Sequence, residues 1–225
     1  MNENLAVTSE TYSATELFVT GSGYPIVTDS VTIAAGQNLT RGTVLGKITK
    51  GAVTVAAAGA GEAGANTGDG TLTMDATTPI LAGAKAGVYV VKCTVAATNS
   101  GTFRVFDPDG YVLGDVAVGA TFANGIKFAI ADGSGADFAA GDGFAVTIAA
   151  GSGSYNAVNS ANIDGSDAPV AVLASDANAT DGAVVAPVYL TGEFNAAALV
   201  FGGSDTYATH KDDLRKLGFF VKTVA

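Results

Sequence analysis

The sequence predicts a mainly β protein in which one small β-sandwich domain is inserted into another β domain. The chain has 225 residues, 30 of them glycine, and charged residues make up only 14%. Its apolar residues occur mostly in short alternating runs between turn residues. Glycine is costly inside helices, whereas short alternating runs are typical of half-buried strands. The length is sufficient for one large or two small domains.

The charge balance excludes several classes of partner. The formal net charge is −10, and only 11 residues are Lys or Arg. Phosphate backbones and anionic membrane surfaces attract clustered basic residues, which this chain lacks, so we expect no nucleic acid and no membrane as partners. A single cysteine allows no intrachain disulfide. The first ten residues lack the features of a signal peptide, which predicts a protein made in the cytoplasm.

The N-terminal part predicts an arm followed by short strands. Residues 1–24 are polar and weakly patterned, which is typical of a segment that is loosely ordered on its own. Their compact apolar cluster consists of Leu17, Phe18 and Val19. From residue 25 the pattern changes to short strands. The strand candidates are Val31–Ile33, Thr43–Ile48 and Val53–Val55.

Two Gly-rich stretches, residues 56–70 and 151–154, predict linkers on either side of a separate β domain. Asp107–Gly110 between them predicts a hairpin turn, because proline presets one corner and glycine accepts a positive φ. Several short strands at a spacing of roughly 8–12 residues predict a small Ig-like sandwich over 59–151. Alternation over 88–95 places four residues on one face: Tyr89, Val91, Cys93 and Val95. Cys93 is therefore expected to be a packed thiol.

After residue 155 the pattern resembles that of the first segment again. Residues 168–174 and 184–190 predict strands, and Pro187 in the second indicates an edge strand or a break. Residues 194–199 predict one or two helical turns. A helix is expected over Thr209–Leu217, with Thr209 as its N-cap and Gly218 as its stop. The predicted domains are a 1–24 arm, a discontinuous domain of 25–58 plus 152–225, and the 59–151 insert.

The outer segments resemble the lambda-type bacteriophage head decoration protein family. The resemblance rests mainly on Arg41–Lys47, RGTVLGK, on GEFN at 192–195, and on a closing helix followed by glycine. The order and approximate spacing agree once the insert is removed. The motif residues, which we expect to have structural roles, are Gly36, Gly42, Thr43, Leu45, Gly46, Gly192, Phe194, Asn195 and Gly218.

This resemblance implies a β-clip type body and a structural, non-enzymatic role. Family members bind the major capsid protein as homotrimers on the outer surface of the expanded head, and they stabilise it against internal DNA pressure. The protein would be made in the bacterial host cytoplasm and end in the virion. The family's arm orders on the capsid by adding to a sheet. The candidate capsid-binding residues are Leu17, Phe18, Val19, Tyr24, Pro25 and Ile26.

An alternative function is that of an adhesin-like module, in which the insert binds a host-surface glycan or protein. The chain has no tryptophan, and the insert's tyrosines are Tyr89 and Tyr111, which gives few aromatic platforms for a sugar. A hydrolase is not expected, because no nucleophile and base are placed together. The insert carries one Glu and eight Asp against four basic residues, a net charge of −5.

Other motifs predict no catalytic residue, cofactor or metal. Residues 59–64 match GxGxxG, but no helix is expected after them, as a dinucleotide site requires. Asp132, Asp137 and Asp142 could be calcium ligands, but we expect them instead to form Asp-Gly turns on a sandwich edge. The single histidine, His210, is expected at the surface on the first turn of the helix.

Overall fold

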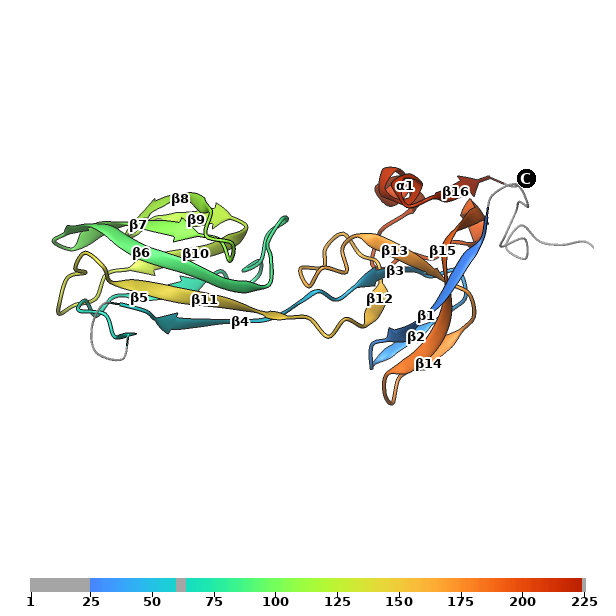
Figure 1. The fold of residues 1–225 in the computed structure, drawn as a ribbon, viewed down its shortest axis with the longest axis horizontal. Coiled ribbons are helices and arrows are strands. Elements are labelled where there is room, and N and C mark those ends of the chain that lie inside the picture. Colours follow the sequence, from blue (N-terminus) through green and yellow to red (C-terminus); the bar gives the residue numbers. More distant parts are fainter. Residues whose placement is uncertain (1–24, 60–63, 224–225) are drawn as a thin grey trace, which may run out of the picture. The chain divides into compact units, whose positions relative to one another are not determined.

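The computed structural model describes residues 25–59 and 64–223. These form two compact units, and each is described separately. Unit 1 contains the described residues up to Lys47 together with Ser154–Ala161 and the chain from Ser166 onward. Unit 2 contains Ile48–Gly153 and the short segment Asn162–Gly165. Figure 1 shows strands throughout both units, which confirms the mainly β prediction.

Unit 1 is built on a closed ring of five strands. In spatial order they are β1 (Val27–Ile33), β12 (Tyr155–Ala157), β3 (Val44–Lys47), β13 (Pro169–Leu173) and β15 (Val184–Asn195). The ring closes because β15 also pairs with β1, from Val27 opposite Thr191 to Ile33 opposite Val184. β16 (Phe219–Lys222) adds in parallel to the end of β15. β2 (Gln37–Leu39) and β14 (Ala177–Ala179) form a separate two-stranded sheet.

The central strands of unit 1 are buried on both faces. Along β3, Leu45 belongs to one apolar cluster and its neighbour Val44 to another. β13 divides in the same way, with Leu173 in the first cluster and Val172 in the second. Neighbouring residues of a strand point to opposite faces, so both faces must be covered. Burial on both faces explains why apolar residues follow one another directly in these two strands.

Unit 2 has two antiparallel sheets that share one apolar core. The larger sheet has the order β4 (Lys50–Ala57), β11 (Gly143–Ala150), β6 (Gly87–Ala97), β7 (Ser100–Phe106) and β8 (Val112–Ala117). The smaller sheet has the order β5 (Thr71–Met74), β10 (Ile126–Ala131) and β9 (Thr121–Asn124). Both sheets contribute to the core, which includes Phe103 and Val146 from one and Phe128 from the other.

The boundary of the inserted unit differs from the predicted one. β4 was expected within the outer domain, which was to end at residue 58, but β4 pairs along its length with β11 and so belongs to unit 2. The expected linker 56–70 also packs on unit 2 where it is described. Thr67 and Gly68 there donate their backbone N–H groups to the carboxylate of Asp142.

One α-helix is found in the described part of the chain, as predicted, but it begins earlier. α1 runs from Tyr207 to Lys216 and its N-cap is Thr206. Thr209, the expected N-cap, is the third helical residue, and its hydroxyl accepts the N–H of Thr206 at 3.2 Å. No helix among residues 25–59 and 64–223 is long and apolar enough to cross a membrane.

Pro187 lies inside a paired strand rather than at a sheet edge. It is opposite Ser30 of β1, and its carbonyl accepts the N–H of Ala174 at 3.0 Å. The N–H of Ser30 is bound by the carboxylate of Asp29 at 2.7 Å. The nitrogen and carbonyl of a strand residue face the same edge, so the missing N–H of Pro187 faces the end of β13, where the ladder with β15 stops at Leu173 opposite Val188. The expected helical turns at 194–199 are a 3₁₀ helix, Ala196–Ala198.

Candidate functional site

The start of β1 is the described part of the predicted capsid-binding arm. Leu17, Phe18, Val19 and Tyr24 lie outside the described residues. Pro25 and Ile26 immediately precede β1, and Thr191 of β15 binds the backbone on both sides of Ile26. The Thr191 hydroxyl donates to the carbonyl of Pro25 at 2.8 Å and accepts the N–H of Val27 at 3.2 Å. The side chains of Ile26 and Val27 are 46% and 45% exposed.

Within the described residues, one edge of β1 is paired at one end only. One edge pairs with β15 over the whole strand, with a register shift between Val27 and Thr28. On the other edge, the ladder within the described residues consists of one pair, Ile33 with Tyr155 of β12. An open edge of this kind can accept a further strand through main-chain hydrogen bonds. Two exposed apolar side chains, Ile26 and Val27, lie beside it.

The first group of family-motif residues lies in the turns and strands around β3. Gly36 and Gly42 adopt φ values of +84° and +87°, which side chains rarely tolerate. Thr43 is 1% exposed, and its hydroxyl donates to the carbonyl of Thr40 at 2.7 Å. Leu45 is fully buried in a core cluster. A side chain at Gly46 would overlap the backbone carbonyl of Ser166, so the two segments approach too closely for any other residue.

The second group of motif residues lies where β15, β16 and α1 meet. Phe194 is fully buried, and its ring lies 5.8 Å from that of Phe219. Asn195 is also fully buried, and its Oδ1 accepts the N–H of Ala197 at the start of the 3₁₀ helix. Gly218 ends α1 with φ +83°, and its carbonyl accepts the N–H of Gly192 at 3.2 Å. These residues make contacts that build unit 1.

His210 is buried, which corrects the expectation of a surface residue. Only 3% of it is exposed, and its Nε2 lies 2.7 Å from Oδ2 of Asp205. Its ring stacks on Phe201 at 5.7 Å. The other carboxylate oxygen of Asp205 accepts the Ser160 hydroxyl at 2.7 Å. Burial alone would raise the pKa of Asp205, but the hydrogen bonds from Ser160 and His210 outweigh it and hold this pKa below its ordinary value.

Two of the three aspartates considered as calcium ligands have other partners, whereas Oδ1 of Asp132 is buried without a hydrogen-bond partner among the described residues. The carboxylate of Asp142 is 1% exposed and accepts three backbone N–H groups, those of Thr67, Gly68 and Ala139, at 2.9–3.0 Å. Asp137 accepts the N–H of Asn99 at 2.7 Å. No group of three or more potential metal-ligating His, Cys, Asp or Glu residues occurs in the part of the chain that the structure describes.

Cys93 lies in the core of unit 2, where 2% of it is exposed. Burial, together with the nearby charge of Asp142, raises the pKa of its thiol above the ordinary value. A thiol that stays protonated is a poor nucleophile. The contacts of Cys93 are therefore those of a packed side chain.

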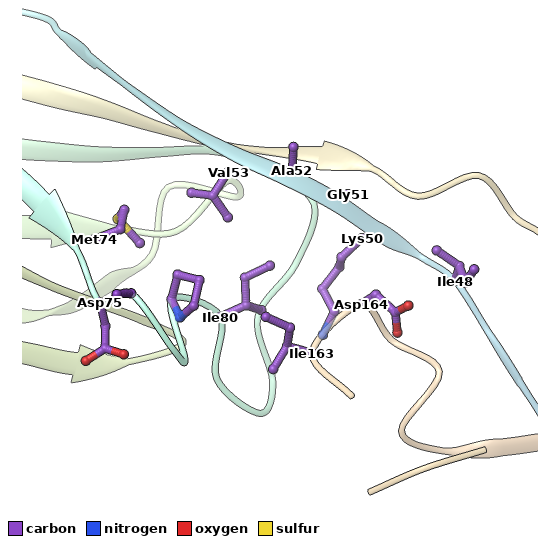
Figure 2. Close-up of a pocket in the computed structure, with 12 residues that line it drawn as sticks. Ile48, Lys50, Gly51, Ala52, Val53, Met74, Asp75, Ile80, Ile163 and Asp164 are labelled. Carbon is purple, nitrogen blue, oxygen red and sulfur yellow. The ribbon is translucent and has the colours of Figure 1, made fainter. Parts of the chain in front are cut away.

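Unit 2 contains an apolar cavity of about 600 Å³ beside β4. Figure 2 shows Val53, Met74, Ile80 and Ile163 around this space. Lys50 is the one cation among the residues that line it. Sequence reasoning missed this site because its walls come from four separate segments, and the alternation of strand residues gives no sign of the cavity.

Comparisons with curated proteins and with solved structures identify no family for this chain. No curated protein matches the chain. Two crystal structures of FlgL from Xanthomonas campestris match at 22% and 24% identity, with TM-scores of 0.30 and 0.29. The matches cover 49% and 47% of this chain but only 33% and 31% of the FlgL chains, and at these TM-scores they carry no argument.

The family model described as bacteriophage lambda head decoration protein D matches residues 6–100 and 96–219. The first match includes β1 to β3, and the second includes β12 to β15 and α1. Together the matches span both segments on which the sequence resemblance rests. The chain therefore belongs to the bacteriophage lambda head decoration protein D family, whose members are structural proteins of the phage capsid.

Proposed function

We propose that this protein binds the outer surface of the expanded phage head as a homotrimer and stabilises it against the pressure of the packaged DNA. The arm of residues 1–24 and the start of β1 would contact the major capsid protein. The observation that carries this proposal is the open edge of β1, together with the exposed side chains of Ile26 and Val27 beside it.

Main-chain pairing at a sheet edge places few demands on the partner's sequence. Each such contact is weak, because ordering an arm costs conformational entropy. Three arms on one trimer would offset this cost through effective concentration. Selective binding to the expanded lattice would then stabilise that lattice over its precursor by linkage.

We further propose that unit 2 faces solvent on the assembled head, since a chain tolerates an inserted domain where it is exposed. Trimer contacts would involve the β body and the region of α1. Sedimentation velocity of the purified chain tests the trimer separately from capsid binding. A monomer at all accessible concentrations would refute that part of the proposal.

Co-sedimentation with capsids tests the decoration role. The purified protein is mixed with expanded, undecorated capsids or with unexpanded proheads of its own phage. We expect saturable binding to expanded capsids alone, and its loss on deletion of residues 1–24. Failure to bind either lattice would overturn the proposal.

Two matched variants test the part played by β1. Val27→Asp should weaken binding at least about tenfold, because it places a charge where an apolar side chain would be buried. Val88→Asp on β6 of unit 2 is the control, since Val88 is 47% exposed against 45% for Val27. Equal loss of binding in both variants would contradict a contact through β1.

A further inference from the structure

We propose that the cavity beside β4 binds a small amphipathic carboxylate, with its aliphatic tail in the cavity and its head group on Lys50. The volume of about 600 Å³ lies within the range of roughly 300–1,000 Å³ that is usual for small-molecule sites. The site lies within unit 2, apart from the proposed capsid-binding strand. Its occupancy therefore does not depend on the decoration role.

The lining of the cavity fits an aliphatic tail. Its apolar side chains come from β4 and the residues just before it, from the end of β5, from the loop before β6 and from the segment Asn162–Gly165. The main ones are Ile48, Val53, Met74, Pro79, Ile80 and Ile163. None of these is aromatic, so the site offers no platform for stacking a ring. A flexible hydrocarbon chain is the ligand that such walls accommodate best.

A β-bulge turns Lys50 toward this cavity. Between the pairs Ile148–Val53 and Ala150–Lys50, β4 contains one residue more than β11. The extra residue reverses the alternation, so Lys50 and Val53 lie on the same side of β4. Figure 2 shows both side chains directed toward Ile80 and Ile163, while Ala52 points to the opposite side. Bulges often redirect a side chain in this manner beside functional sites.

The segment that carries Ile163 is held firmly in place. The carbonyl of Asp164 accepts the N–H groups of both Thr49 and Lys50, at 2.9 and 2.8 Å. Gly165 follows with φ +97°, and a side chain there would overlap the hydroxyl of Thr49. This wall of the cavity is therefore fixed to the strand that presents Lys50. Because the site is already ordered, binding does not have to supply the free energy of ordering it.

The charges around the cavity favour an anionic head group at Lys50. The carboxylate of Asp75 is occupied by Lys127 Nζ at 2.8 Å and by the N–H groups of Thr77 and Thr78. In Figure 2 the carboxylate of Asp164 is turned away from the Lys50 ammonium. Repulsion by the other acidic residues of unit 2 is short-ranged at physiological salt, where the Debye length is about 8 Å.

Isothermal titration of the full chain with saturated carboxylates tests this proposal. Octanoate, decanoate and dodecanoate should bind at one site per chain, with affinity rising up to about fourfold for each added CH₂, or about 0.8 kcal/mol. The gain should cease once the cavity is full. Absence of saturable binding, or affinity independent of chain length, would overturn the proposal.

A variant at Lys50 separates the head group from the tail. Lys50→Met should weaken decanoate binding about tenfold, as expected for loss of a hydrogen bond from a charged donor. Binding of decan-1-ol should change less than about twofold. Lys92→Met is the control, because it removes the same charge from an exposed residue of β6 outside the cavity. Equal decanoate binding by the two variants would refute the role of Lys50.

Discussion

Replacing Asp142 with alanine should strongly destabilise unit 2. The buried carboxylate accepts three backbone N–H groups, which bring residues 67 and 68 next to residue 139. Hydrogen bonds to a charged acceptor contribute about 1.5–3 kcal/mol each. The lower value gives roughly 4.5 kcal/mol for three, and partial relaxation of the backbone leaves an expected loss of about 3–4 kcal/mol. Domain stabilities are usually about 5–15 kcal/mol, so this loss would be severe.

The single cysteine provides an assay specific to unit 2. Cys93 is buried in the core of this unit, so the rate at which a thiol reagent modifies it reports the opening of unit 2 alone. Labelling should be much faster in Asp142→Ala than in the unmodified chain, and denaturant should unfold unit 2 at a lower concentration. Asp137→Ala is the control, because its exposed carboxylate accepts one N–H group, that of Asn99. We expect it to cost at most about 1 kcal/mol.

The effect of Asp142 should also depend on pH. Burial alone would raise the pKa of this carboxyl, but the three N–H groups outweigh burial and hold the pKa below its ordinary value. A carboxyl whose pKa is lower in the folded than in the unfolded chain stabilises the folded state at any pH above the unfolded pKa, which is near 4. This stabilisation is lost as the pH falls through the folded pKa. The difference between the unmodified chain and Asp142→Ala should therefore shrink below about pH 4. Equal labelling rates for both at pH 7 would refute this reasoning.

Two further predictions concern unit 1. Gly46→Ala should prevent the normal folding of unit 1, because its Cβ would overlap the carbonyl of Ser166, and loss of dispersed amide signals from unit 1 in an NMR spectrum would show this. Asp205→Ala should lower the free energy of unfolding of unit 1 by about 2–4 kcal/mol, since it leaves His210 and Ser160 without their buried acceptor. The pKa of Asp205 is lowered in the folded chain, so the stability that its carboxylate contributes should be lost in acid. The melting temperatures of the unmodified chain and of Asp205→Ala should therefore converge as the pH is lowered from 7 to 3. A constant difference between them over this range would contradict this.

The strand pattern was predictable from the sequence where the alternation is regular. Tyr89, Val91 and Cys93 of β6 face the core as expected. Val95 was expected on the same face but is 57% exposed, because the register with β7 shifts between Cys93 and Val95. A bulge adds a residue without changing the composition of a strand, so periodicity alone cannot reveal it.

Contacts between residues far apart in the sequence were not predictable. The stretch 56–70 has the composition of a linker, and its attachment to unit 2 depends on Asp142, which lies about 75 residues later. His210 was expected at the surface on the first turn of the helix, because no residue that could act with it was visible in the sequence. Its burial depends on Asp205, whose carboxylate is bound in turn by Ser160, 45 residues earlier. Such pairings arise from the fold, and a single sequence contains no signal for them.

The two ends of the inserted unit lie side by side. The N–H of Gly153 donates to the carbonyl of Ile48 at 3.0 Å, and Tyr155 pairs with Lys47 immediately beyond. Two strands that are already neighbours form the same junction whether a short turn or a whole domain connects them, and the entropy of closing a longer connection rises only slowly with its length. The pairing that forms the ring of unit 1 therefore requires neither a particular length nor a particular fold of the chain between Ile48 and Gly153.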